Sequence, residues 1–151
     1  FVKVGDIAVV PYGRGSKLAG IKLSGKGDVT GSHRVWETDA SSFVPTPAAH
    51  EGHVYTVRDR GEVLCTNPLS GETLWKGQFP KDRASYYSSP AIAEDKIYSA
   101  REDGTVFVAQ IDGGFKLLSE NAMGERIIAS PVPVNNRLLL RGEKHLFCIK
   151  P

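Results

Sequence analysis

The sequence predicts an all-β fold built from repeated four-stranded antiparallel sheets. Three observations predict it: an internal period of 40 to 46 residues, short segments rich in β-branched and aromatic residues, and turn residues at regular distances. Sixteen glycines and nine prolines are spread along the 151 residues, as expected for many turns between short strands. The length is that of one ordinary domain and is sufficient to bury a core.

The repeat is marked by pairs of glycines ten residues apart. The pairs are Gly15 and Gly25, Gly61 and Gly71, and Gly104 and Gly114, and a fourth copy starts at Lys144, so the copies are separated by 46, 43 and 40 residues. A second landmark, Thr46-Pro47, Ser89-Pro90 and Ser130-Pro131, repeats at 43 and 41 residues. A period of this length with strand-like segments is typical of β-propeller blades.

Each repeat is predicted to contain four strands. In the second repeat we expect them at about 43–51, 53–58, 62–67 and 73–79. Val54–Val57 is apolar or aromatic on both faces, which favours a strand covered on both sides, whereas Lys76-Gly77-Gln78 is polar, as an outermost strand should be. We therefore predict about four four-stranded β-propeller blades at 1–38, 39–80, 81–123 and 124–151, the first and the last incomplete.

The segment from Cys65 to Trp75 resembles the tryptophan-docking motif of quinoprotein-type, PQQ-like propellers. The residues that occupy the Ala, Asp, Thr, Gly and Trp positions of that motif are Cys65, Asn67, Ser70, Gly71 and Trp75. In this motif the glycine permits a turn and the tryptophan packs on the neighbouring blade. Leu118 is the expected equivalent of Trp75 in the third repeat, and a seven-residue insertion displaces the first repeat's tryptophan to Trp36.

The resemblance covers nearly the whole chain and implies a BamB-like repeat protein, interpreted as a C-terminal fragment of a longer bacterial propeller. It also implies a periplasmic or extracellular location. Two functions follow from the resemblance. The first is a non-catalytic scaffold or binding platform for a protein or surface ligand, without cofactor. The alternative is a fragment of a PQQ-dependent quinoprotein dehydrogenase, whose PQQ and Ca²⁺ residues would lie outside this chain.

The residues favour the scaffold over the enzyme. No adjacent cysteine pair is present, and no set of Asp, Asn and Glu recurs at channel-facing positions, whereas a hard cation requires clustered oxygen ligands. We predict no catalytic, cofactor or metal residues. The four histidines, His33, His50, His53 and His145, have no metal-ligand spacing. Gly13–Lys17 is interpreted as a hairpin turn rather than a phosphate loop, since it lacks the P-loop spacing.

Composition also limits the partners. The net charge is +2 with no block of basic residues, so no nucleic-acid partner is predicted. No apolar run is long enough to cross a membrane. Open blade faces would favour a homo-oligomer. Cys65 and Cys148 share one repeat position with Ala19 and Val108, and are predicted to be free, buried thiols.

Two groups of residues are candidates for partner contact. Arg58, Arg101 and Arg141 each lie three residues before the hairpin-end landmark, so the repeat would place them at one rim, where they would bind an anion or an acidic partner. The alternative is that each arginine pairs with a nearby acid such as Asp59, Glu102 or Glu143. Arg83, Tyr86 and Tyr87 have the composition of an interface hot spot. The alternative is that the two tyrosines begin the innermost strand of the third blade.

Overall fold

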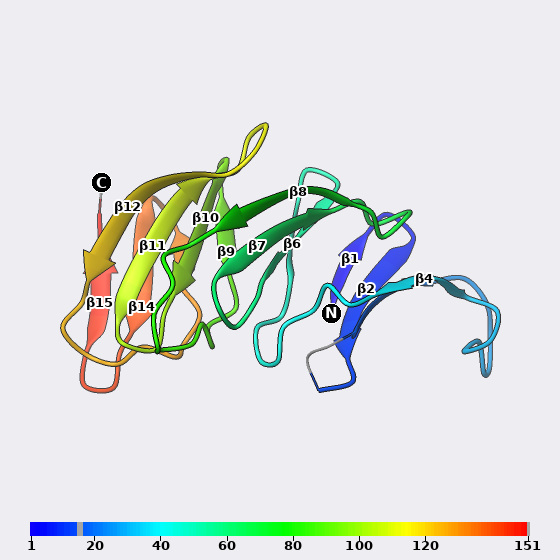
Figure 1. Ribbon diagram of the computed structural model, residues 1–151, viewed down its shortest axis with the longest axis horizontal. Coiled ribbons are helices and arrows are strands. Elements are labelled where there is room, and N and C mark those ends of the chain that lie inside the picture. The colour runs from blue at the N-terminus through cyan, green and yellow to red at the C-terminus, as the bar shows by residue number, and fades with distance from the viewer. Residues whose placement is uncertain (15–16, 151) are drawn as a thin grey trace.

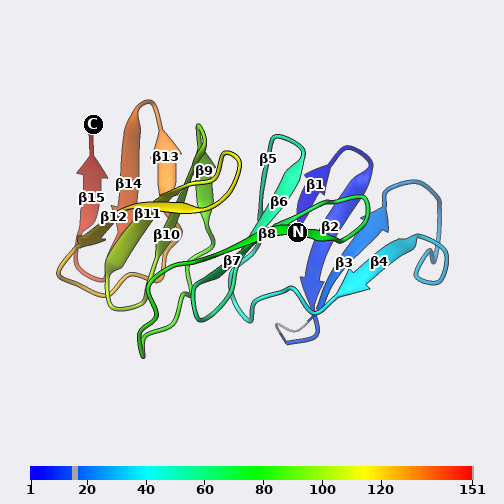
Figure 2. The same cartoon turned by 45° about the horizontal axis from the view of Figure 1, so that its top comes forward.

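The computed structural model describes residues 1–14 and 17–150, so the predicted turn glycine Gly15 lies outside the described residues. Fifteen strands form four antiparallel sheets that stand side by side in chain order (Figure 1 and Figure 2). The first sheet contains β1 (Val2–Val4), β2 (Ile7–Tyr12), β3 (Lys17–Lys22) and β4 (Arg34–Thr38). The second contains β5 (Ala48–His50), β6 (His53–Val57), β7 (Glu62–Thr66) and β8 (Thr73–Gln78). The third contains β9 (Ala91–Ala93), β10 (Lys96–Ala100), β11 (Thr105–Gln110) and β12 (Lys116–Ala122), and the fourth β13 (Val132–Val134), β14 (Arg137–Arg141) and β15 (Leu146–Ile149).

The sheets have the geometry predicted for propeller blades. Strands follow one another across each sheet in chain order, and the first strands are neighbours, since β1 contacts β5, β5 contacts β9 and β9 contacts β13. The described residues contain no helix, and so none that could span a membrane. The all-β propeller-blade prediction is therefore confirmed.

Two details of the strand prediction were wrong. The first sheet has all four strands, because a first strand of three residues, such as Val2–Val4, is the full length of this element in every sheet. The first strand of the second sheet is Ala48–His50 rather than 43–51, since Pro45 and Pro47 have no N–H to donate to a ladder. The fourth sheet has three described strands, as expected.

The core lies between the sheets, in three clusters that each join two neighbours. In β6, Val54 packs in the cluster shared with the first sheet, whereas Tyr55 and Val57 pack in the cluster shared with the third. All of Val54–Val57 is at most 5% exposed. The prediction that both faces of this strand are covered is confirmed, and β8 alternates between half-buried and exposed residues, as predicted for an outermost strand.

A β-bulge between the third and fourth strands corrects the tryptophan register. The ladder shifts by one residue in the first three sheets, and the extra residues are Val35, Leu74 and Leu118, each 45–48% exposed. Leu118 is therefore a bulge residue and not the buried equivalent of Trp75. Ser119, which pairs with Val108, takes that place.

Trp36 is the tryptophan that docks most completely on a neighbouring sheet. Its indole is 9% exposed, and Nε1 donates a hydrogen bond to the carbonyl oxygen of Pro68 at 2.7 Å. The ring lies against two glycines: a Cβ on Gly20 would come within 2.2 Å of the indole and one on Gly71 within 2.6 Å. Gly71 also has a φ of +75°, so it serves both the turn and the docking surface. Trp75 is half-buried and packs on Tyr55, with ring centroids 5.8 Å apart.

Candidate functional site

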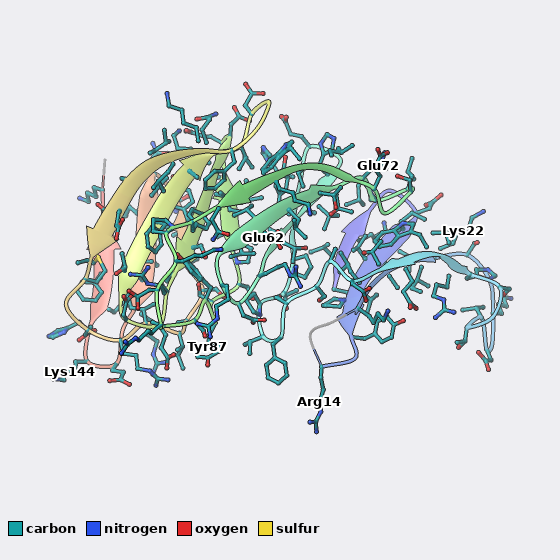
Figure 3. The ribbon with its side chains drawn as sticks, in the orientation of Figure 1. Arg14, Lys22, Glu62, Glu72, Tyr87 and Lys144 are labelled. Atoms are coloured by element: carbon teal, nitrogen blue, oxygen red, sulfur yellow. The ribbon has the colours of Figure 1, made fainter. Side chains whose placement is uncertain are left out.

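The hairpin ends that carry the predicted arginines gather at one end of the sheets. Arg14 follows β2, and Lys144 lies between β14 and β15. Figure 3 shows both at the lower end together with Tyr87, while Lys22 and Glu72 lie nearer the other end. We call this lower end the hairpin rim; it comprises the β2–β3, β6–β7, β10–β11 and β14–β15 turns. The rim brings the predicted elements together, but their side chains differ in what they contact.

Arg101 is a structural residue. Its side chain is 7% exposed and donates from Nη2 to Asp103 at 2.7 Å and from Nη1 to the Pro80 carbonyl oxygen at 3.1 Å. The guanidinium lies 5.1 Å from the ring centroid of Phe107, within cation–π range. The hydrogen bond to Asp103 raises the pKa of Arg101 and outweighs the opposite effect of burial. The guanidinium of Arg101 is buried and already paired with a carboxylate, so it is not available to bind an anion. Arg101 is therefore not part of the predicted anion site.

The two other arginines differ from Arg101 and from each other. Arg58 pairs with Glu62 at 2.8 Å, rather than with Asp59, and donates from Nε to the Ser41 carbonyl oxygen at 3.1 Å. Arg141 is exposed, and its side chain makes no hydrogen bond or ion pair within residues 1–14 and 17–150. Of the three predicted arginines, Arg141 is therefore the one whose guanidinium is left unpaired at the rim.

The loop before the third sheet buries one of its tyrosines. Tyr86 is fully buried, stacks on Phe79 with centroids 5.9 Å apart, and donates from its hydroxyl to Pro80 at 2.8 Å. Burial raises the pKa of its hydroxyl. Tyr86 is therefore part of the core and not of a contact surface, and neither tyrosine begins a strand, since β9 starts at Ala91. Tyr87 is half-buried and Arg83 is exposed, so these two stay on the surface.

Charged side chains at the rim join neighbouring sheets. Arg126 bridges the third and fourth hairpin ends, since Nε donates to Glu102 at 3.0 Å and Nη1 to Glu143 at 3.3 Å. Glu125 accepts the backbone N–H of His145 and contacts its ring Nδ1, both at 3.0 Å. Burial raises the pKa of Glu125, but these hydrogen bonds together lower it by more, so the pKa lies below its ordinary value. The rim charges thus hold the sheets together.

The Thr/Ser-Pro landmark also joins sheets. The backbone N–H of Thr46 donates to Ser89 Oγ at 2.9 Å, and that of Ser89 donates to Ser130 Oγ at 3.0 Å. Each hydroxyl therefore accepts a bond from the preceding repeat, 43 and 41 residues away. This linkage explains why the hydroxyl recurs with the period of the fold.

A cleft separates the third and fourth sheets. Its volume is about 850 Å³, and the apolar residues that line it include Tyr98, Val106, Val108, Met123, Val134, Leu138 and Ile149. Polar and charged residues share the lining: Glu94, Lys96, Asn121, Asn135, Asn136, Arg137 and Lys150. A concave surface that combines apolar side chains with polar groups is the usual form of a binding site.

The cysteine prediction was half right. Both thiols are free, and Cys65 is buried, where desolvation raises its pKa. Cys148 is exposed, contrary to the prediction, because β15 pairs only with β14 in the described structure and its sheet has no fourth strand. The same repeat position is therefore core in one sheet and surface in another.

Comparison with known proteins identifies the family. The family model described as "Outer membrane protein assembly factor BamB" matches residues 5–77 and 25–137, most of the chain. The chain belongs to this family. A search of curated proteins gave no match.

Solved structures agree with the family on the fold. This BamB-like chain is similar to BamB from Moraxella catarrhalis, with 19% identity and a TM-score of 0.71 over 93% of this chain and 39% of that one. It is also similar to the computationally designed Ika4 protein, with 15% identity and a TM-score of 0.75 over 99% of this chain and 87% of Ika4. A europium-containing methanol dehydrogenase aligns at 15% identity and a TM-score of 0.60, over 78% of this chain and 23% of the enzyme. At these identities the likeness shows the fold alone.

One group of side chains among the described residues could hold a metal ion. It consists of His50, Glu51 and Asp95, so one imidazole accompanies two carboxylates. Sequence reasoning missed this cluster and the cleft. The cluster could have been found by aligning the segment 50–52 with its equivalent 93–95 in the next repeat, because neighbouring repeats place equivalent turns beside each other.

Proposed function

We propose that this BamB-like chain is a non-catalytic binding platform of a bacterial propeller that works outside the cytoplasm and holds a protein partner. The observation that carries the proposal is the cleft of about 850 Å³ between the third and fourth sheets, to which both sheets contribute apolar side chains. The family's description as an outer membrane protein assembly factor supports a protein as the ligand and a location in the periplasm.

The ligand that fits best is an extended segment with alternating apolar side chains. Two sheets form the walls of the cleft, so an extended chain between them would face apolar residues on both sides. Proteins that cross the outer membrane consist of strands of about ten residues with this alternation. A segment of that kind matches both the cleft and the family description.

A fluorescence-anisotropy titration tests the proposal. The probe is a labelled ten-residue peptide that alternates Val or Tyr with Thr or Lys, and the matched control peptide has the same composition with its apolar residues gathered at one end. Val134 lines the cleft and is 40% exposed, so Val134→Glu should be tolerated by the fold. It should weaken binding at least about tenfold, because it replaces an apolar contact with a charge that the peptide's apolar side chains would have to desolvate.

The control variant is Leu69→Glu, at a residue that is 72% exposed and does not line the cleft. We expect it to bind the alternating peptide like the parent chain. Failure of the parent chain to bind the alternating peptide, equal binding of the two peptides, or unchanged binding by Val134→Glu would each refute the proposed function.

A further inference from the structure

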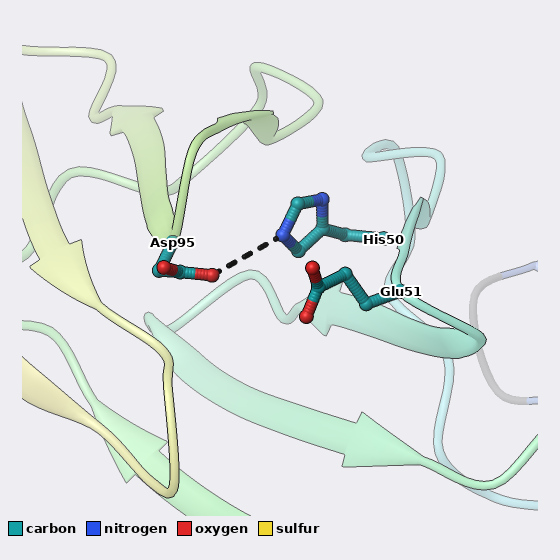
Figure 4. Close-up of side chains that lie close together, drawn as sticks. All are labelled: His50, Glu51 and Asp95. Atoms are coloured by element: carbon teal, nitrogen blue, oxygen red, sulfur yellow. Dashed lines mark ion pairs between the residues drawn. The ribbon is translucent and has the colours of Figure 1, made fainter.

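We propose that His50, Glu51 and Asp95 form a binding site for a divalent transition-metal cation of the zinc class, between the second and third sheets. His50 is the last residue of β5, Glu51 follows it in the β5–β6 turn, and Asp95 belongs to the β9–β10 turn of the next sheet. Figure 4 shows the imidazole and the two carboxylates lying close together. The site would thus be a shared one, with ligands from two equivalent turns.

The distances between the donor atoms suit one small cation. One donor atom from each residue lies within 4.8 Å of the other two, and His50 Nε2 is 3.5 Å from Asp95 Oδ1. Ligand bonds of about 2.0–2.2 Å in a tetrahedral zinc site place ligand atoms about 3.3–3.6 Å apart. The imidazole and Asp95 already have this separation. The Glu51 side chain is exposed, and its donor atom lies within 4.8 Å of the other two.

A second observation points to a ligand at the imidazole. His50 Nε2 is buried and has no hydrogen-bond partner among the described residues, although Asp95 lies at ion-pair distance. A buried polar atom without a partner costs free energy, about 1–3 kcal/mol for a typical group. A cation bound at Nε2 would remove this cost and would also neutralise the two carboxylates beside it.

The surroundings leave room for the cation and a water ligand. The three residues line a pocket of about 260 Å³, together with His53, Asp112 and the buried Cys65. Asp112 adds a third carboxylate to its wall, which strengthens the negative potential. Three protein ligands with one position left for water is a common zinc arrangement.

The other repeats show that the site is specific to this junction. Val4, Ala93 and Val134 stand where His50 stands, so no other first-to-second-strand turn carries an imidazole at that position. Asn136 replaces Asp95 in the fourth repeat. The turn geometry is shared, since Glu51, Glu94 and Asn135 all have φ values between 44° and 50°. The ligand set is therefore an addition to a common scaffold rather than a consequence of the repeat.

The donor set favours zinc over calcium and magnesium. One imidazole nitrogen with two carboxylate oxygens suits Zn²⁺, whereas Ca²⁺ takes six to eight oxygens and Mg²⁺ prefers an octahedral oxygen shell. The proposal is independent of the peptide cleft, which lies between the third and fourth sheets. Failure of either proposal leaves the other standing.

Isothermal titration calorimetry with ZnCl₂ tests the site, and CoCl₂ supplies a visible absorption band as a spectroscopic signature of coordination. We expect one Zn²⁺ per chain, no comparable binding of CaCl₂, and at least about tenfold weaker binding by His50→Gln and by Asp95→Asn. Matched controls are Asp6→Asn, at the turn position equivalent to Asp95 in the first repeat, and His33→Gln, a histidine outside the cluster. Both controls should bind Zn²⁺ like the parent chain.

Three results would overturn the proposal. They are the absence of saturable Zn²⁺ binding, an affinity unchanged in both cluster variants, or equal loss of affinity in the controls. His50 and Asp95 are at least partly exposed, so the variants should fold, and the urea midpoint of each variant without metal verifies this.

Discussion

At the scale of single residues, Trp36 shows how one side chain fastens two sheets together. It extends from β4, lies over Gly20 of its own sheet and reaches Gly71 and Pro68 of the next one. Both glycines are required because a Cβ at either position would overlap the ring. The indole N–H also satisfies a carbonyl oxygen that would otherwise be covered without a partner.

Truncation of Trp36 should destabilise the fold more than truncation of Trp75. Trp36→Ala removes a buried ring and a hydrogen bond, so we expect the free energy of unfolding to fall by about 3–5 kcal/mol. Trp36→Phe keeps most of the packing and should lose about 1–2 kcal/mol, largely through the lost indole donor. Trp75→Ala, at a half-buried position, is the matched comparison. Urea denaturation gives the three values, and an equal or larger loss for Trp75→Ala would contradict this ranking.

The two cysteines should differ in reactivity. Cys65 is buried and its thiol pKa is raised by desolvation, whereas Cys148 is exposed on β15. Because the thiolate is the nucleophile, Ellman's reagent should titrate one thiol per folded chain and two in denaturant. Cys148→Ser should abolish the rapid reaction of the folded chain with Ellman's reagent, and Cys65→Ser should leave that reaction intact. Two fast thiols in the folded parent chain would show that Cys65 is accessible.

The residue positions that sequence predicted correctly are those set by local rules. Gly71 was identified as a turn glycine, and the polar outer strand and the two-sided burial of Val54–Val57 follow from residue type alone. The burial of Tyr86 and Arg101 could not be predicted, because it depends on Phe79 and Phe107, which come from two different sheets. Leu118 was misplaced because a bulge adds one residue that the glycine-to-tryptophan spacing does not reveal.

At the scale of elements, the connections that lead into the third and fourth sheets share one pattern of backbone hydrogen bonds. In the connection that leads into the third sheet, the Tyr86 N–H donates to the carbonyl oxygen of Asp59, at the hairpin end of the second sheet. The carbonyl oxygen of Ser85 accepts from the N–H of Glu102, at the hairpin end of the third sheet. In the next connection, Ile127 N–H donates to Glu102 and Arg126 accepts from Glu143. Each of these two connections therefore adds backbone bonds between two hairpin ends. The period in the sequence reflects this pattern as well as the strands.

The hairpin end of the third sheet should contribute to stability in a pH-dependent way. Burial raises the pKa of Asp103, but hydrogen bonds from Arg101 and from the Thr105 N–H outweigh it, so the folded-state pKa lies below the ordinary 3.8. A depressed pKa means that the charged carboxylate stabilises the fold above about pH 4 and that this contribution is lost as the pH falls through the folded-state pKa. Asp103→Asn should therefore be less stable than the parent chain at pH 7, with the difference shrinking in acid.

Urea midpoints measured from pH 7 down to pH 2.5 would check this dependence. The informative quantity is the difference between the parent chain and Asp103→Asn at each pH, because it cancels the titration of other groups. A difference that stays constant over the whole range would mean that ionisation of Asp103 does not contribute, and that its role is only to accept hydrogen bonds.

At the scale of the whole molecule, the four sheets form an open row, and apolar side chains are exposed at both of its ends. Phe1 and Val35 of the first repeat are 74% and 48% exposed, and Leu146 of the fourth is 70% exposed. The repeats between them cover one another through the three core clusters. Exposed apolar surface of this kind favours association.

We therefore expect two chains to associate through their outer sheets. Light scattering behind size exclusion, over a concentration series, should give about twice the chain mass of 16.4 kDa. Leu146→Lys should shift the mass toward one chain, since it places a charge at the outer sheet, whereas Leu69→Lys, in the β7–β8 turn, should not. A mass of one chain at every concentration would show that the exposed outer sheets do not pair with each other.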